Sequence, residues 1–208
     1  MLVKRYLHLI DPQGLGTWED RHHGLQCLQR YSLNAETTET ARFADWIDHH
    51  SSGIHTFLLD LPDEGFHLEQ IPPVSGQDRQ KLIARRQMQQ FFGSPFVATI
   101  PLGRVQDGRR DEHVLLVALT RPGNLLPWLQ ALREAEARLA RVCSPALLTR
   151  PLLRLLRPTN PQGLILSFSH SGIRQTYFEQ GCLRFSRLSP PPEGEFASGG
   201  HGCLSATR

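Results

Sequence analysis

Long hydrophobic runs are missing from this sequence. No apolar stretch approaches the ~20 residues that a membrane-spanning helix needs, although hydrophobic residues make up 39% of the 208 positions. Lys4 and Arg5 stand near the N-terminus, but His8 interrupts the apolar stretch that follows and no cleavage site is present. We therefore expect neither a membrane span nor a signal peptide in the chain.

Closely spaced cysteines and a strong charge bias are also missing. The cysteines stand far apart, without a CxxC pair, at Cys27, Cys143, Cys182 and Cys203. Such scattered thiols are typical of reduced, cytosolic proteins. The 23 Lys and Arg residues are balanced by 20 Asp and Glu residues, whereas nucleic-acid-binding domains usually carry a pronounced basic patch. The composition therefore favours a cytoplasmic protein that does not bind nucleic acid.

A complete catalytic motif is missing as well. The sequence contains no Gly-x-Ser-x-Gly nucleophile elbow, and residues 169–172 (SHSG) do not form one. The histidine pairs at 22–23 and 49–50 lack a Cys or acidic partner at ligand spacing, and adjacent side chains project in different directions. We expect these histidines to be solvated and expect no metal site. The chain is interpreted as a binding or scaffolding module rather than an enzyme.

Alternating strands and helices are what the sequence does contain. Period-two alternation of apolar residues predicts strands, and apolar residues three and four apart predict helices. The predicted strands cover residues 4–10, 25–33, 54–61, 66–71, 96–104 and 113–120. The predicted helices cover residues 37–50, 75–92 and 124–142. The recurring order of two strands and a helix indicates an α/β layered fold.

Two hairpins and one long helix are the sharpest of these predictions. Turn residues at 62–65 predict a hairpin between strands 54–61 and 66–71, and those at 106–109 predict a second hairpin between strands 96–104 and 113–120. In the predicted helix 124–142, apolar residues recur every three or four positions from Leu125 to Val142. That spacing is typical of one buried helical face.

The pattern changes after residue 157. A polar stretch rich in Pro and Gly at 158–163 resembles a hinge, and short apolar strands follow at 164–168, 173–178 and 182–188. Residues 191–208 are rich in Pro, Gly and Ser and have little to bury, so we expect them to be disordered. The predicted division is an α/β lobe at 1–157, a hinge at 158–163, a β-meander at 164–190 that opens a second lobe, and a tail at 191–208.

The element order and the β-meander carry a resemblance to a known family. The most specific part is LILSFSHSGI at 164–173, followed by FEQGCLRFSR at 178–187 with its aromatic-x-Arg ending. These features resemble the actin-like cytoplasmic domains of the type IV pilus M component and the type II secretion L component, loosely over residues 1–190. The resemblance implies an actin-like, RNase H-like fold of mixed sheets layered with helices.

The same resemblance locates two turns that bind nucleotide phosphates in actin-like proteins. The second turn would be 167–172, where the acidic residue of the family falls on Ser167 and its first glycine on Ser169, leaving Gly172. The first turn would be DPQGLG at 11–16. Because serine lacks the charge that holds Mg²⁺, we expect no nucleotide hydrolysis.

Three functions remain open. The leading one is a non-catalytic scaffold of a pilus or secretion assembly machine, without a cofactor, at the cytoplasmic face of the inner membrane. The resemblance implies that it binds a peptide of a neighbouring component or an assembly ATPase. The second is an actin-like ATPase or kinase that binds ATP and Mg²⁺ through Asp11, Gly14, Gly16, Ser169 and Gly172. A weaker third is an RNase H-like nuclease that uses Asp11 and Asp60, for which a third carboxylate is not apparent.

Two sequence features are candidates for partner binding. The densest basic cluster on a predicted helix contains Arg79, Lys81, Arg85 and Arg86. It could meet an acidic partner, an anionic membrane surface or RNA, but it also suits an ordinary solvated helix face. Trp18 stands among polar residues and could anchor an interface or pack beneath a loop. Asp11, Gly14 and Gly16 also allow two interpretations: a turn that binds a phosphate, or an ordinary Asp-Pro turn without a ligand.

Overall fold

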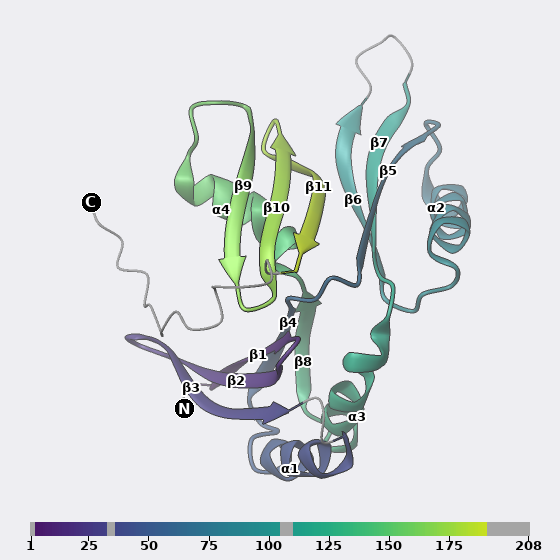
Figure 1. Ribbon diagram of the computed structural model, residues 1–208. Helices are drawn as coiled ribbons and strands as arrows, with labels where there is room; N and C mark the ends of the chain where they lie inside the picture. Colours follow the sequence, from purple (N-terminus) through teal and green to yellow (C-terminus); the bar gives the residue numbers. More distant parts are fainter. Residues whose placement is uncertain (1–2, 33–35, 105–109, 191–208) are drawn as a thin grey trace.

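A five-stranded mixed sheet forms the centre of the fold. The computed structural model describes residues 3–32, 36–104 and 110–190 (Figure 1). The strands lie in the order β3-β2-β1-β4-β8, with bounds β1 Arg5–Asp11, β2 Gly14–Arg21, β3 Gly24–Ser32, β4 Ile54–Leu59 and β8 Arg138–Cys143. Strands β1, β2 and β3 form an antiparallel meander, whereas β1, β4 and β8 run parallel. Parallel neighbours need long crossover connections, and helices supply part of each one.

Helices α1 (Glu36–Asp48) and α3 (Leu126–Glu134) lie together against one face of this sheet (Figure 1). Phe43 and Ile47 are four residues apart on α1, so they point the same way and are fully buried. Trp128 and Leu132 have the same spacing on α3. These four side chains pack with apolar residues of the sheet in one core cluster, which fixes the ends of the parallel strands that carry the candidate site.

A second, three-stranded sheet follows β4. Its order is β5-β7-β6, with β5 Glu64–Ile71, β6 Val97–Arg104 and β7 Glu112–Leu119, all antiparallel. Helix α2 (Gly76–Phe91) covers one face, where Leu82 and Ile83 pack on Val114 and Leu116. Successive side chains of β7 point to opposite faces of the sheet. On the face away from α2, Leu115 packs near Leu183 of the third sheet. The middle strand β7 is therefore buried on both sides.

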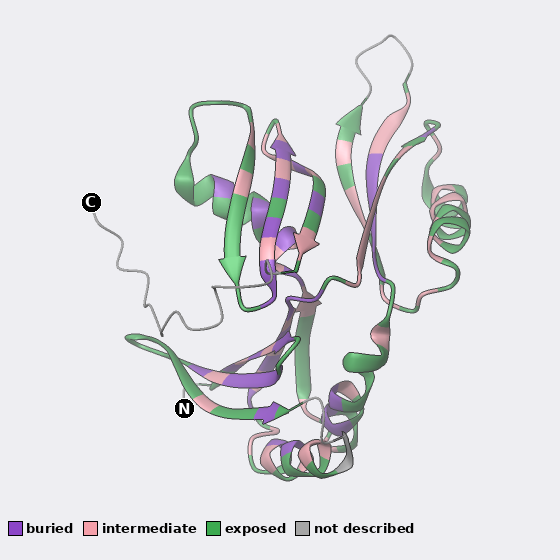
Figure 2. Cartoon of the chain, viewed as in Figure 1, coloured by how far each residue is buried: buried purple, intermediate pink, exposed green. Residues whose placement is uncertain are grey.

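The third sheet contains β9 (Gln162–Ser169), β10 (Gly172–Glu179) and β11 (Cys182–Ser189) in the order β11-β10-β9. A short 3-10 turn, η2 (Pro145–Leu148), and helix α4 (Thr149–Leu156) connect it to β8. In Figure 1 this sheet stands beside β5 and β6, and Figure 2 shows that β9 is largely exposed. Leu164, Leu166 and Phe168 alternate along β9 and all remain solvent-exposed.

The prediction of one long helix at 124–142 is wrong. Helix α3 ends at Glu134, Glu136 has a φ of 50°, and the chain then forms β8. Leu139 was assigned to the buried helical face but is exposed on β8. Pairing with β4 decides the outcome, because its backbone hydrogen bonds favour a strand over local helical spacing.

Two further predictions are wrong. Strands 54–61 and 66–71 do not form a hairpin, because β4 pairs with β1 and β8 while β5 pairs with β7. Residues 14–21 belong to none of the predicted strands, but they form β2, which carries Trp18 in its middle. The sequence is too polar there to reveal a strand that is buried mainly by its neighbours.

Several predictions are confirmed. The hairpin of β6 and β7, helices α1 and α2, and all three strands of the last sheet lie within a few residues of their predicted bounds. The predicted tail at 191–208 lies outside the described residues. Within the part of the chain that the structure describes, every helix is too short or too polar to cross a bilayer.

Candidate functional site

The first predicted phosphate turn joins β1 to β2, and its carboxylate is already engaged. Asp11 Oδ1 accepts hydrogen bonds from the backbone N–H groups of Gln13 (2.9 Å) and Gly14 (3.0 Å). Arg30 donates to Asp11 Oδ2 at 2.9 Å. The Asp11 side chain is almost fully buried, so the turn and the guanidinium neutralise its charge. This arrangement is an aspartate-capped tight turn, which leaves the carboxylate little capacity for a metal ion.

The glycines of this turn are required by packing. A Cβ on Gly14 would lie 1.9 Å from the Tyr31 carbonyl oxygen, and its φ of 150° disfavours other residues. A Cβ on Gly16 would lie 2.2 Å from the Trp18 ring. Trp18 is therefore half-buried over its own strand, in agreement with the packing alternative, and both glycines have a structural purpose without a ligand.

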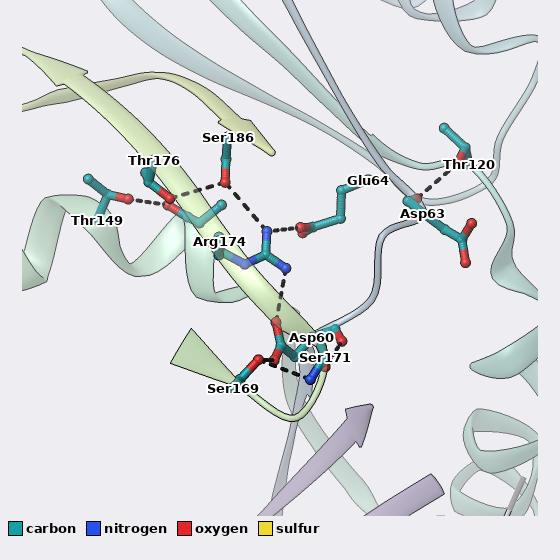
Figure 3. A network of polar contacts seen from close by, with 11 residues as sticks. Asp60, Asp63, Glu64, Thr120, Thr149, Ser169, Ser171, Arg174, Thr176 and Ser186 are labelled. Atoms are coloured by element: carbon teal, nitrogen blue, oxygen red, sulfur yellow. Dashed lines mark hydrogen bonds and ion pairs between the residues drawn. The ribbon is translucent and has the colours of Figure 1, made fainter. Parts of the chain in front are cut away.

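The second predicted turn joins β9 to β10 and contacts Asp60, which directly follows β4 (Figure 3). Ser169 Oγ donates to Asp60 Oδ2 at 2.6 Å, and Ser171 Oγ donates to the Asp60 carbonyl at 2.6 Å. A Cβ on Gly172 would lie 2.0 Å from the Ser189 carbonyl oxygen. The serine-rich sequence of this turn thus serves to dock it against the central sheet.

Asp60 also lies beside the first turn. Its backbone N–H donates to the Ile10 carbonyl at 2.8 Å, next to Asp11 in the chain. The structure therefore brings both predicted turns to the same end of the central sheet, with Asp60 at the junction. Asp60 is one of the two carboxylates of the nuclease alternative, but nothing in the sequence indicated that Ser169 would bind it.

Arg174 of β10 is the residue that sequence analysis missed. Its side chain is only 3% exposed, and it makes ion pairs with Asp60 Oδ1 (3.1 Å) and with Glu64 at the start of β5. Burial raises the pKa of Glu64, while the Arg174 guanidinium and the Ser144 hydroxyl oppose that shift. Figure 3 shows the guanidinium between the two carboxylates. The single guanidinium is shared by both carboxylates and offsets part of the negative charge that a Mg²⁺ ion would need.

The basic cluster on α2 is largely paired with acidic residues. Arg79 makes a bidentate contact with Glu112 at 3.0–3.2 Å, and Arg86 lies 3.5 Å from Glu69. Arg85 is exposed and has no ion pair among the described residues. The three arginines therefore do not form one free basic surface. Among the described residues no group of three or more His, Cys, Asp or Glu could hold a metal ion.

An apolar cleft that the sequence did not indicate lies between the first two sheets. It has a volume of about 150 Å³ and is lined mainly by residues of β6, β7 and β8, with Glu64 as its acidic member. Val97 and Ala98 form the β6 side, and Leu59 and Val142 come from the central sheet. The cleft is the size of one large apolar side chain.

Comparison with known structures identifies the fold. The PilM-PilN type IV pilus biogenesis complex matches with a TM-score of 0.62 at 15% identity, over 89% of this chain and 61% of that chain. The cytoplasmic domain of EpsL, an inner-membrane component of the type II secretion system of Vibrio cholerae, matches with a TM-score of 0.51 at 13% identity, over 90% of this chain and 71% of that one.

A third match is a Bacteroides thetaiotaomicron protein of unknown function with an actin-like ATPase fold, with a TM-score of 0.51 at 10% identity over 90% of this chain and 70% of that chain. No protein-family model and no curated protein gives a significant match to the sequence. The resemblance drawn from the sequence is thus confirmed at the level of the fold: the chain has an actin-like fold of layered mixed sheets and helices.

Proposed function

We propose that this chain is a non-catalytic, protein-binding module of a pilus or type II secretion-like assembly machine, and that it acts at the cytoplasmic face of the inner membrane. The actin-like fold shared with a PilM-PilN complex and with the EpsL cytoplasmic domain supports the class of system. The proposal includes the division into a first lobe at 1–157, a hinge at 158–163 and the opening of a second lobe at 164–190. The observation that carries the binding role is the apolar cleft beside β6.

Strand β6 is an edge strand of its sheet, so one side of its backbone is open to a further strand. An extended segment of a partner protein can pair with such an edge while one of its side chains fills a neighbouring pocket. The cleft beside Val97 accommodates one large apolar side chain, whose burial contributes roughly 1.5–3 kcal/mol. An aromatic or leucine anchor in an extended peptide is therefore the ligand that fits.

Site-specific crosslinking in the native host cell tests this binding role. A photoreactive amino acid at Val97, on the rim of the cleft, is expected to crosslink to a component of the pilus or secretion machine. The same amino acid at Gln77, exposed on α2, is the matched control. The absence of a Val97-specific product, or a product from an unrelated protein, would contradict the proposal.

A synthetic segment from the crosslinked partner then sharpens the test. Ala98→Arg introduces a long side chain into the cleft lining and should weaken the affinity for that segment by roughly tenfold or more, because it occupies the space that the apolar anchor of the peptide would fill. Gln77→Arg should leave the affinity unchanged. Equal affinities of the two variants would exclude the cleft as the binding site.

The alternative is an actin-like ATPase or kinase, and one observation favours it: both candidate phosphate turns meet at Asp60. Against it, Arg30 already pairs with Asp11 and Arg174 with Asp60. If the chain bound Mg-ATP, nucleotide at one hundred times its Kd would raise the free energy of unfolding by about 2.7 kcal/mol. We expect no rise in melting temperature with Mg-ATP and no phosphate release; either result would favour the enzyme.

A further inference from the structure

A second cavity lies at the far end of the third sheet. It has a volume of about 330 Å³ and is formed by α4, the segment after it and the turn between β10 and β11. The turn docked on Asp60 is at the opposite end of β10 (Figure 1). The cavity is therefore separate from the candidate site described above.

Three arginines line this cavity. Arg150 and Arg154 are four residues apart on α4, so their side chains lie on one face of the helix, and Arg157 follows as the residue that caps its C-terminus. The three side chains make no ion pair with any described residue, and no carboxylate lines the cavity. Glu179, close by in the chain, is paired with Arg184 at 3.1 Å. The cavity thus concentrates positive charge without an internal counterion.

The backbone around the cavity holds uncommon conformations. Arg157 ends α4 with a φ of 47°, a left-handed position that glycine or asparagine usually occupies. Gln180 has a φ of 50°, and its N–H donates to the Pro161 carbonyl at 2.6 Å, which joins the β10–β11 turn to the segment after α4. Left-handed non-glycine residues are found disproportionately at functional sites. This conformation places Arg157 with the other two guanidinium groups in the cavity lining.

We propose that this cavity binds a phosphate-bearing anion. Guanidinium groups donate paired N–H hydrogen bonds that match the oxygens of a phosphate, and the lining adds the amide side chains of Asn160 and Gln180 as further donors. The volume suits a small phosphorylated group rather than a single ion. The same chemistry is offered by a soluble phosphorylated molecule and by the headgroup of an anionic lipid. The inference is independent of partner binding at the apolar cleft.

Calorimetric titration with inorganic pyrophosphate at low salt tests the site. Arg154→Gln and Arg157→Gln should each weaken binding by roughly tenfold or more, because each removes a charge-assisted donor. Arg133→Gln is the matched control: Arg133 is also an exposed arginine in a last helical turn, on α3, but lies outside the cavity. It should bind pyrophosphate as the wild type does. An equal loss in all three variants would show nonspecific charge attraction and overturn the proposal.

Flotation with vesicles separates the two sources of the phosphate. Wild-type protein is mixed with vesicles of phosphatidylglycerol or of phosphatidylcholine, with the same variants and with pyrophosphate as competitor. Selective binding to phosphatidylglycerol that pyrophosphate displaces identifies a lipid headgroup. Pyrophosphate binding without vesicle binding identifies a soluble ligand. If wild-type protein binds neither pyrophosphate nor anionic vesicles, the proposal is wrong.

Discussion

The central sheet and the third sheet are built on different physical principles. In the central sheet, apolar and aromatic side chains such as Ile10, Leu15 and Phe57 are buried beneath α1 and α3. In the third sheet, one face is exposed, with Leu164 at 57% and Phe168 at 72%. Its inner face carries the buried polar residues Thr176, Ser186 and Arg174. The central sheet is thus held together by hydrophobic burial, whereas the third sheet combines the apolar contact of Leu183 with polar contacts to Asp60 and Glu64.

Removal of Arg174 should have the largest effect on stability. Arg174→Ala leaves Asp60 and Glu64 buried without their cation, and breaking a buried ion pair costs roughly 3–5 kcal/mol. Arg187→Ala, on the exposed side of β11, should change stability by less than about 0.5 kcal/mol. Urea unfolding of both variants measures the difference. Similar midpoints for the two would contradict a polar attachment of the third sheet.

Leucine truncation compares the two sheets directly. Leu15→Ala removes a fully buried side chain from β2 and should lower the free energy of unfolding by roughly 2–5 kcal/mol. Leu164→Ala makes the same chemical change on the exposed face of β9 and should cost less than about 0.5 kcal/mol. Thermal and urea unfolding measure both. A large loss from Leu164→Ala would mean that this face is covered by a partner in solution.

The central core also contains a buried pair of histidines. His55 Nε2 lies 3.2 Å from the His50 carbonyl, which can only accept, so this nitrogen carries a proton. In neutral His55, Nδ1 then accepts from His8 Nε2 at 2.9 Å, and His8 Nδ1 accepts from the Thr17 hydroxyl at 3.0 Å. The chain of contacts fits two neutral rings. Burial lowers the pKa of both histidines; the neighbouring His55 lowers that of His8 further, whereas the hydrogen bond to the His50 carbonyl partly opposes the shift at His55.

This pair predicts a loss of stability in mild acid. The unfolded chain binds protons below a pKa near 6.5 while the folded pair resists them, so stability falls as the pH drops through that value. The slope should approach about 1.4 kcal/mol per pH unit for His8, whose pKa lies well below its usual value, and His55 should add a smaller amount. Urea unfolding between pH 7.5 and 5.5 measures it, and NMR of labelled imidazoles should show that His8 and His55 remain neutral as the pH falls through 6.5. Stability that is independent of pH over this range would contradict the prediction.

Among the substitutions that remove a described interaction, the smallest effect is expected at Asp11. Asp11→Asn keeps an oxygen that accepts from the turn and loses only the ion pair with Arg30, which is 44% exposed. Such half-exposed pairs contribute about 1 kcal/mol or less. Urea unfolding should show a loss of that size. A catalytic role would instead appear as Mg-ATP-dependent phosphate release by the wild type that this substitution abolishes.

Much of the fold was predictable because its patterns are local. The hairpin of β6 and β7, helix α2 and the meander from β9 to β11 each contain their own periodicity and turn residues. The sequence also located both candidate turns correctly at the ends of strands. It could not show that Arg174 would pair with Asp60 at this junction, because the two residues are far apart in the chain and no local pattern links them.

By itself, the sequence determined the elements whose hydrogen bonds and apolar faces lie within a few residues of one another. Tertiary structure decided that β8 is a strand, that β4 and β5 belong to different sheets, and that Arg174 meets Asp60 across 114 positions of the chain. Local spacing reports the geometry of one element, whereas strand pairing and the burial of charge depend on which distant groups are brought together.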